Sequence, residues 1–323
     1  MPNGLERFDF YLDQIEKLMT TASQEKDPGM WLYQNNARTS IFMIEGLAKL
    51  YGGLHNKKRF GEIEAHFKLL EDSLGAIDYY DGFAKQFSVD KTVSSRITKF
   101  AASKSVEKAA MLNVSLLKKG WVGTGADRIL KIRKKLRGAD WLDDKPEIRA
   151  IESFYRASIK KIDTFAEIYQ KGFTELETQV HELRRKLRWL SIYPQALRGR
   201  IQLTKNAADD KKVKKYLTPE IVNSPFNKMH AAGANRYVLL LDRDYFFALS
   251  WMISELGKLK DQGLRLVLLE EAGNKAGPGL ADETQILANA TDICRVYFAE
   301  KNLDKLISSV IKNRPSLRQR MSI

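Results

Sequence analysis

The chain has 323 residues, of which 44% are hydrophobic and 29% are charged, and its formal net charge is +14. This composition is typical of a folded globular protein with one large or two ordinary domains, and it argues against a mostly disordered chain. The single cysteine, Cys294, excludes an intramolecular disulfide bond and a cysteine-based zinc cluster. We expect Cys294 to be a small core residue in a reducing, cytoplasmic environment.

The first part of the chain has a helical period of apolar residues. We predict helices near 4–20, 30–51, 60–88, 94–119 and 124–138, separated by DPG (27–29), YGG (51–53) and GWVGTG (120–125). No apolar run approaches the roughly 18 residues that a membrane-spanning helix needs. The start, MPNGLERFDF, has neither a basic nor an apolar segment of the kind that signal peptides carry. We therefore expect no membrane span and no signal peptide.

A polar stretch at mid-chain, GADWLDDKP (138–146), predicts a boundary between a domain of residues 1–140 and one of residues 141–323. Beyond it we predict helices near 146–171, 173–197, 205–216, 241–271, 281–299 and 301–313. YVLLLDRDYFF (237–247) is the best strand candidate, but its apolar pattern continues into a helical period. Since no other segment alternates convincingly, the sequence predicts an all-α fold.

The positive charge is concentrated in the middle of the chain. The net charge is −2 over residues 1–98, +14 over residues 99–261 and +2 over residues 262–323. Concentrated positive charge favours a polyanionic partner, which could be a nucleic acid, anionic lipid or a phosphate polymer. The alternative is a scattered basic surface that keeps the protein soluble.

The segment VHELRRKLRWL (180–190) combines an apolar face with a basic one. Val180, Leu183, Leu187 and Leu190 share the apolar face of the predicted helix. A second face carries residues at positions i, i+3, i+4 and i+7, which are neighbours on a helix. This basic stripe consists of His181, Arg184, Arg185 and Arg188. We expect that Glu175, Glu177 and Glu182 do not neutralise the whole stripe, so that a neighbouring helix or an anionic ligand must do so.

Neighbouring helices repeat this arrangement of basic residues. Basic side chains share a face of the helix at 124–138 and a face of the helix at 146–171, and two lysines end the helix at 94–119. Arginine suits phosphate because its planar guanidinium donates paired hydrogen bonds. The further candidate anion-binding residues are Lys118, Lys119, Arg128, Lys131, Lys135, Arg149, Arg156 and Lys160.

Two short markers occur in both halves of the chain. NNAR (35–38) is followed by LGAID (74–78), and HELR (181–184) is followed by LGKLKD (256–261). The first markers lie 146 residues apart, and Gly75 and Gly257 lie 182 apart. We interpret the chain as a duplicated helical unit with an insertion in the second copy that includes 204–217. Asp78 and Asp261 are expected to form salt bridges with the basic stripe and to fix its side-chain rotamers.

A histidine followed by arginines three and seven residues later, with LGxLxD on a later helix, resembles the CHAD family, the conserved-histidine α-helical domain. His181, Arg184, Arg188, Gly257 and Asp261 match this pattern. In the first half, asparagine fills the histidine position, the first arginine is kept, and phenylalanine and tyrosine replace the next basic and the acidic residue. Those positions are Asn35, Arg38, Phe42 and Tyr79.

The resemblance implies two pseudo-symmetric helical bundles with a basic groove between them. It also implies binding of inorganic polyphosphate without catalysis and without a cofactor, with Arg38 among the site residues. The alternative is an RNA- or DNA-binding protein that uses the same basic face. Such a protein would need stacking aromatic residues, for which Trp189 and Tyr193 are the candidates, although a packing role explains both more simply.

An enzyme that acts on phosphate polymers is disfavoured by the sequence. We find no clustered carboxylates of the kind that hold divalent metal ions, and no nucleotide-binding or zinc-protease motif. His55, His66 and His230 are isolated in the sequence and are interpreted as structural or surface residues. The sequence therefore predicts a binding protein rather than an enzyme.

Overall fold

The computed structural model describes residues 3–205, 208–273 and 282–313. The chain forms two compact units, of which the first contains residues 1–141 and 267–276 and the second contains residues 142–266 and 277–323. The first division, after Trp141, lies one residue beyond the boundary expected from the sequence. The second division lies within helix α10 (Arg243–Glu271), so the last turn of that helix belongs with the first unit.

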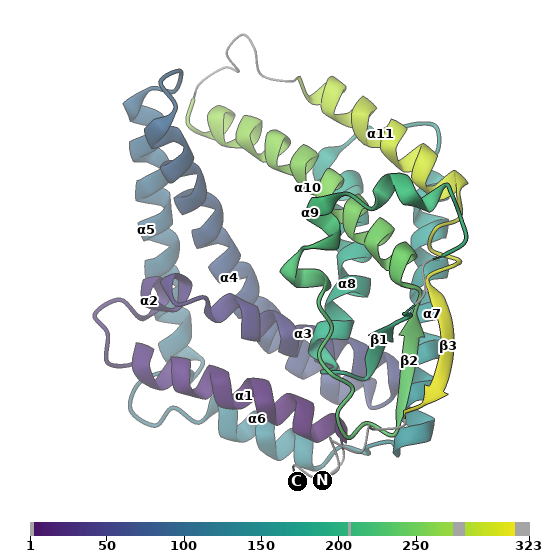
Figure 1. Ribbon diagram of the computed structural model, residues 1–323. Helices are drawn as coiled ribbons and strands as arrows, with labels where there is room; N and C mark the ends of the chain where they lie inside the picture. Colours follow the sequence, from purple (N-terminus) through teal and green to yellow (C-terminus); the bar gives the residue numbers. More distant parts are fainter. Residues whose placement is uncertain (1–2, 206–207, 274–281, 314–323) are drawn as a thin grey trace. The chain divides into compact units, whose positions relative to one another are not determined.

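The first unit is built from six helices and the end of α10 (Figure 1). The six are α1 (Asn3–Ala22), α2 (Pro28–Gln34), α3 (Ala37–Leu54), α4 (Lys57–Val89), α5 (Ser95–Lys118) and α6 (Arg128–Arg137). The helix predicted at 30–51 is divided, because Asn36 adopts a left-handed conformation with φ of 56°. Asp27 caps α2 by accepting a hydrogen bond from the Met30 amide, and Pro28 follows at the first helical position.

Aromatic rings fill the core of the first unit where α1, α3 and α4 meet. The Phe8 and Phe60 ring centroids are 5.7 Å apart, and those of Tyr51 and Trp141 are 5.3 Å apart. Helix α6 is attached to α1 by Arg133, whose guanidinium pairs with three carboxylates of that helix. They are Asp9 at 2.6 Å, Asp13 at 2.5 Å and Glu16 at 3.0 Å. One face of α6 is therefore fixed against α1, and the opposite face remains available for other contacts.

The second unit combines helices with a small sheet. Its helices are α7 (Asp144–Ile168), α8 (Glu182–Ala196), α9 (Pro219–Val222), most of α10 and α11 (Glu283–Ala299). A π-helical turn, Leu176–His181, leads directly into α8. The three strands are β1 (Ile201–Leu203), β2 (Tyr237–Leu241) and β3 (Ile307–Lys312), in the order β1-β2-β3. β1 pairs with β2 in parallel and β3 pairs with β2 antiparallel.

The predominance of helix agrees with the all-α prediction, but three segments differ from it. Residues predicted as a helix at 301–313 contain strand β3, and residues predicted as a helix at 205–216 contain only the 3₁₀ turn Val213–Tyr216 among those described. The first part of YVLLLDRDYFF is strand β2, and α10 begins immediately after it. For β2 and β3, pairing with a distant segment decides the structure, and local periodicity does not report such pairing.

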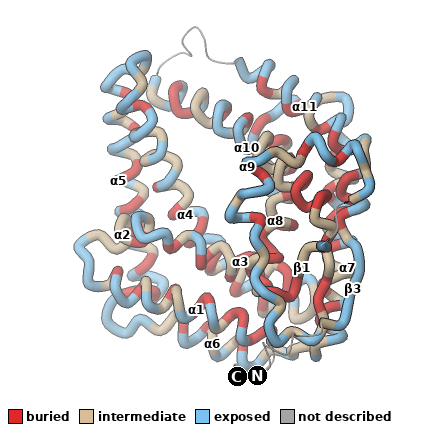
Figure 2. Tube along the Cα trace, in the orientation of Figure 1, coloured by how far each residue is buried: buried red, intermediate tan, exposed pale blue. Residues whose placement is uncertain are grey.

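A buried arginine links the start of the sheet to α7. Arg200 is fully buried and pairs with Asp144 at 2.9 Å and with Glu147 at 2.8 Å. It also donates hydrogen bonds to the carbonyl oxygens of Asp144 and Tyr237. Buried residues run along the inner faces of α7, α8 and the strands (Figure 2), and Arg200 lies within this core. Cys294 is buried as expected, and burial raises the pKa of its thiol to about 12.

Within the described ranges, none of the helices has the length and apolar character needed to traverse a lipid bilayer.

Candidate anion-binding site

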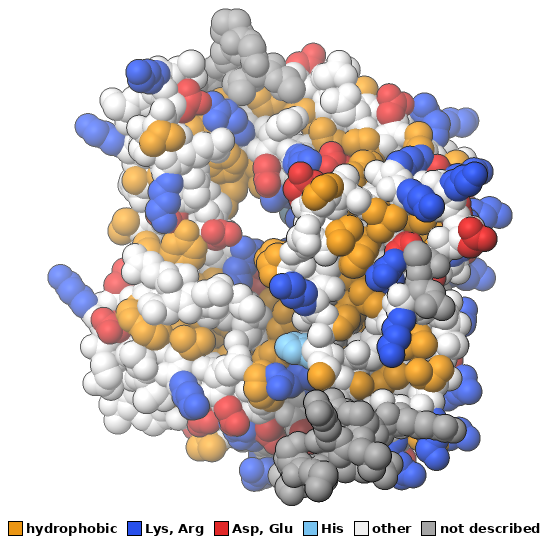
Figure 3. Space-filling model, in the orientation of Figure 1, with side chains coloured by type: hydrophobic (Ala, Val, Ile, Leu, Met, Phe, Trp, Pro, Cys, Tyr) orange, Lys and Arg blue, Asp and Glu red, His pale blue; other side chains and the backbone are white. Residues whose placement is uncertain are grey.

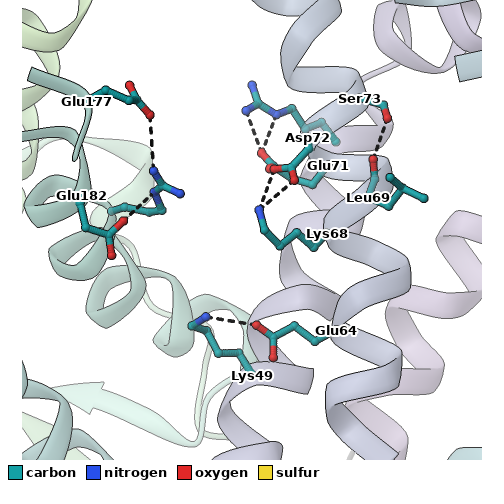
Figure 4. Close-up of polar contacts among 11 residues, drawn as sticks. Lys49, Glu64, Lys68, Leu69, Glu71, Asp72, Ser73, Glu177 and Glu182 are labelled. Carbon is teal, nitrogen blue, oxygen red and sulfur yellow. Dashed lines mark hydrogen bonds and ion pairs between the residues drawn. The ribbon is translucent and has the colours of Figure 1, made fainter. Parts of the chain in front are cut away.

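The basic stripe lies on the π-helical turn and α8 of the second unit, where part of its charge is neutralised. The His181 Nδ1 atom lies 2.7 Å from a Glu177 carboxylate oxygen. Arg185 pairs with Glu177 at 3.6 Å and with Glu182 at 3.3 Å, and Figure 4 shows these two carboxylates. Glu177 and Glu182 therefore pair with His181 and Arg185, which are two of the four residues of the stripe.

Arg184 differs from its neighbours on the stripe, because it makes no ion pair with any carboxylate that the structure describes. Its side chain lies against Gly257 of α10, where a Cβ atom would be 3.1 Å from Nε and 3.3 Å from Nη2. Its Nε donates a hydrogen bond to the Ile253 carbonyl oxygen at 3.2 Å. Burial lowers the pKa of Arg184, and the charge of Asp261 opposes this effect.

Asp261 forms its ion pair elsewhere. Its carboxylate lies 2.6 Å from the Lys260 ammonium group, so the predicted salt bridge between Asp261 and the basic stripe does not form. Arg184 is therefore half-buried with no carboxylate in ion-pair contact among the described residues, although the charge of Asp261 still acts on it from a longer distance. An unpaired, partly buried charge is costly, and an anion that reaches the guanidinium would offset that cost.

Arg38, the matching arginine of the first unit, is fully paired. It lies against Gly75 of α4, where a Cβ atom would be 2.9 Å from Nη2. Its guanidinium pairs with Glu71 at 2.7 Å and with Asp78 at 2.8 Å, so Asp78 pairs with Arg38 and not with the basic stripe as expected. Two carboxylates thus neutralise Arg38.

The surroundings of Arg38 are acidic in other ways as well. Glu45 of α3 is almost fully buried, and burial together with the nearby charge of Glu71 raises its pKa to about 7. Lys68 is held by Asp72 at 2.8 Å, and Figure 4 shows both beside Glu71 on α4. An incoming anion would therefore meet carboxylates around Arg38.

The two arginine–glycine pairs share their geometry and differ in charge. The offset of 182 residues that relates Gly75 to Gly257 also relates Glu71 to Ile253 and Asp78 to Lys260. Where the first unit presents two carboxylates to its arginine, the second presents the backbone carbonyl of Ile253. Among the described residues, the arginine held against its glycine lacks a carboxylate partner in the second unit and has two in the first.

The other predicted residues of the second unit lie on α7. Arg149 and Arg156 both pair with Glu152, at 3.1 Å and 2.9 Å, so one carboxylate draws the two guanidinium groups together. Those contacts lower the pKa of Glu152 although its partial burial acts to raise it. Lys160 is exposed one turn further along the helix.

Three predicted residues of the first unit meet at a separate pocket. Arg128, Lys131 and Lys135 of α6 line it together with Arg59 and His66 of α4. Lys119 lies close enough for its charge to lower the pKa of His66, and its carbonyl oxygen accepts a hydrogen bond from Arg128. Lys118 is exposed at the end of α5. The sequence did not identify Arg59 or His66, because periodicity alone does not show which helix faces which.

Lys and Arg side chains are spread widely over the face of the molecule shown in Figure 3. In the described part of the chain, no group of three or more His, Cys, Asp or Glu side chains is arranged to hold a metal ion.

Comparison with protein-family models, with curated proteins and with solved structures finds no match for this chain.

Proposed function

We propose that this chain is a CHAD-like protein that binds inorganic polyphosphate without catalysis, through the basic stripe of the second unit. The observation that carries this proposal is Arg184, a half-buried arginine held against Gly257 with no carboxylate partner in the described structure. A phosphate oxygen at its guanidinium would supply the missing negative charge through strong charge-assisted hydrogen bonds.

Further cations lie close to Arg184 in the sequence of the same two helices. Arg185 is exposed on α8, and Lys260 follows Gly257 by three residues on α10. His181 precedes Arg184 by one helical turn and Arg188 follows it by another, as the CHAD resemblance implies. A linear polymer with a charge on every phosphate can engage several of these groups at once and release their counterions.

The aromatic residues near the stripe favour a phosphate polymer over a nucleic acid. Trp189 and Tyr193 are both buried, and their rings stack on each other with centroids 5.9 Å apart. They pack the interior of the second unit, as the sequence suggested, so their faces are not presented to bases. Polyphosphate needs no stacking surface, whereas single-stranded nucleic acids gain much of their affinity from one.

The shared arginine–glycine geometry supports the further proposal that the two units descend from one duplicated helical bundle. In each unit an arginine from the first marker lies against the glycine of the second marker. The first copy has then lost its anion site by gaining Glu71 and Asp78 as partners for Arg38. This proposal places binding on the second unit and does not require a groove between the two.

A competition experiment separates polyphosphate from nucleic acid as the preferred partner. A fluorescently labelled single-stranded RNA is bound to the chain at fixed salt, and unlabelled polyphosphate or RNA is added at equal phosphate concentration. We expect polyphosphate to displace the label at a concentration about tenfold lower than RNA does. The affinity of the site should increase with the charge density of the ligand, and the site has no aromatic surface on which bases could stack. Displacement by RNA at equal or lower concentration would favour nucleic-acid binding instead.

A further inference from the structure

We propose that the pocket between α4 and α6 of the first unit is a second anion site, for a compact molecule that carries several phosphate groups. The pocket has a volume of about 500 Å³. Small-molecule sites commonly have volumes of about 300–1,000 Å³. Six of its eight lining residues are basic: Arg59, His66, Arg128, Lys131, Lys134 and Lys135, with Ile132 and Gly138 completing the wall. This site does not depend on the proposed function of the second unit.

The geometry of the pocket follows from how α6 is attached. Arg133 fixes one face of α6 to three carboxylates of α1, so the opposite face, with Lys131, Lys134 and Lys135, turns toward α4. Arg59 donates a hydrogen bond to the Gly138 carbonyl oxygen just beyond the end of α6. The two helices are thus joined at one end of the pocket by a basic side chain.

Acidic residues neutralise only part of the positive charge. Lys131 pairs with Asp127 at 2.7 Å, and Lys135 pairs with Glu62. Arg59, Arg128 and Lys134 have no carboxylate partner among the described residues. Arg128 is instead oriented by the Lys119 carbonyl oxygen, at 2.7 Å from its Nε. Three uncompensated cations around a concave surface favour an anion with more than one charge.

His66 adds a group that responds to the ligand. Its Nε2 atom lies 3.4 Å from Nη1 of Arg128. Burial lowers the pKa of His66, and the charges of Arg128, Lys135 and Lys119 lower it further, while Glu62 opposes them. Lys131, Lys134 and Arg59 complete the charged groups that line the pocket around this ring. A bound anion favours the protonated imidazole, so binding should take up a proton and strengthen as the pH falls.

The pocket wall favours phosphate groups over a nucleotide base. None of its lining residues is phenylalanine, tyrosine or tryptophan, so a base would find no aromatic ring to stack on. Inorganic tripolyphosphate is the probe that fits these requirements. ATP, orthophosphate and long-chain polyphosphate are the comparison ligands, because each shares one chemical feature with tripolyphosphate.

The test is a calorimetric titration of the full chain with tripolyphosphate, before and after Lys131→Ala with Lys134→Ala. We expect the double substitution to weaken binding about tenfold or more, since it removes two cations from the pocket. The control, Lys91→Ala with Lys99→Ala, removes the same charge from exposed positions of the same unit and should change the affinity less than about twofold. Equal losses in both variants would overturn the proposal, because they would report net charge alone.

Two further measurements distinguish binding at the pocket from binding at the basic stripe of the second unit. Arg184→Ala should leave tripolyphosphate binding to the pocket unchanged, whatever it does to long-chain polyphosphate. The chain has four histidines, so the ring resonances of His66 can be assigned by comparison with His66→Gln. Saturating tripolyphosphate should raise the pKa of His66, and His66→Gln should flatten the pH dependence of the affinity. An unchanged pKa of His66 in the presence of bound ligand would place the ligand elsewhere and contradict the proposal.

Discussion

Replacing Arg200 with methionine is expected to lower the free energy of unfolding by about 3–5 kcal/mol, because it removes the buried guanidinium that pairs with two carboxylates. Arg200 is fully buried, and Glu147, one of its two acidic partners, is 1% exposed. Methionine keeps much of the side-chain volume, so most of the loss is electrostatic rather than a cavity. Urea-induced unfolding followed by circular dichroism measures the change.

Two variants control for this interpretation. Arg133→Met also breaks three ion pairs, but the side chains of its partners Asp13 and Glu16 are 62% and 46% exposed, so water can solvate the carboxylates that remain. We expect it to cost about 1 kcal/mol. Adding Glu147→Leu to Arg200→Met should recover part of the stability, since it removes the most deeply buried of the two carboxylates. A loss below that of Arg133→Met would show that the Arg200 cluster is not the link between sheet and α7 that its contacts indicate.

Replacing Arg184 with alanine is expected to weaken binding of long-chain polyphosphate about 10- to 100-fold, because one or two charge-assisted hydrogen bonds are lost at a half-buried position. The side chain donates only one hydrogen bond in the described structure, to the Ile253 carbonyl oxygen. Its removal also relieves an unpaired charge, so the helical structure of the second unit should persist. Fluorescence titration with labelled polyphosphate measures the affinity, and circular dichroism checks the fold.

Arg38→Ala is the matched control within the same chain. Arg38 packs against Gly75 as Arg184 packs against Gly257. The guanidinium of Arg38, however, already forms ion pairs with Glu71 and Asp78. We expect its replacement to change polyphosphate affinity by less than about threefold, through long-range charge alone. Similar losses in both variants would mean that the two arginines serve one surface, and a loss confined to Arg38→Ala would reverse the assignment of the site.

The sequence predicts helices well where an apolar face repeats over many turns, as in α4, α7 and α10. It fails at ISSVIK (307–312), because this segment becomes a strand only by pairing with β2, about 70 residues earlier in the chain. The same limit applies to the strand Tyr237–Leu241, whose apolar run is compatible with either structure until its partners are known.

The candidate site shows a similar division between what local spacing determines and what it does not. Spacing placed Arg184 and Arg38 on equivalent positions, and the structure holds both against the matching glycines. Whether a carboxylate pairs with each arginine depends on residues 33 to 77 positions away, since Glu71 and Asp78 pair with Arg38 while Asp261 pairs with Lys260. Long charged side chains form ion pairs with residues of other helices, so the net charge of a site depends on the folded structure and cannot be obtained from local spacing.

The central claim, that the second unit binds polyphosphate through the basic stripe, is tested most directly by titrating the unmodified chain with long-chain polyphosphate at several salt concentrations. We expect saturable binding whose affinity falls at least about tenfold between roughly 50 and 200 mM salt, because several cations release counterions from the polymer. The slope of log affinity against log salt should decrease in Arg184→Ala. An absence of saturable binding at the lowest salt concentration, or a slope that Arg184→Ala leaves unchanged, would contradict the claim.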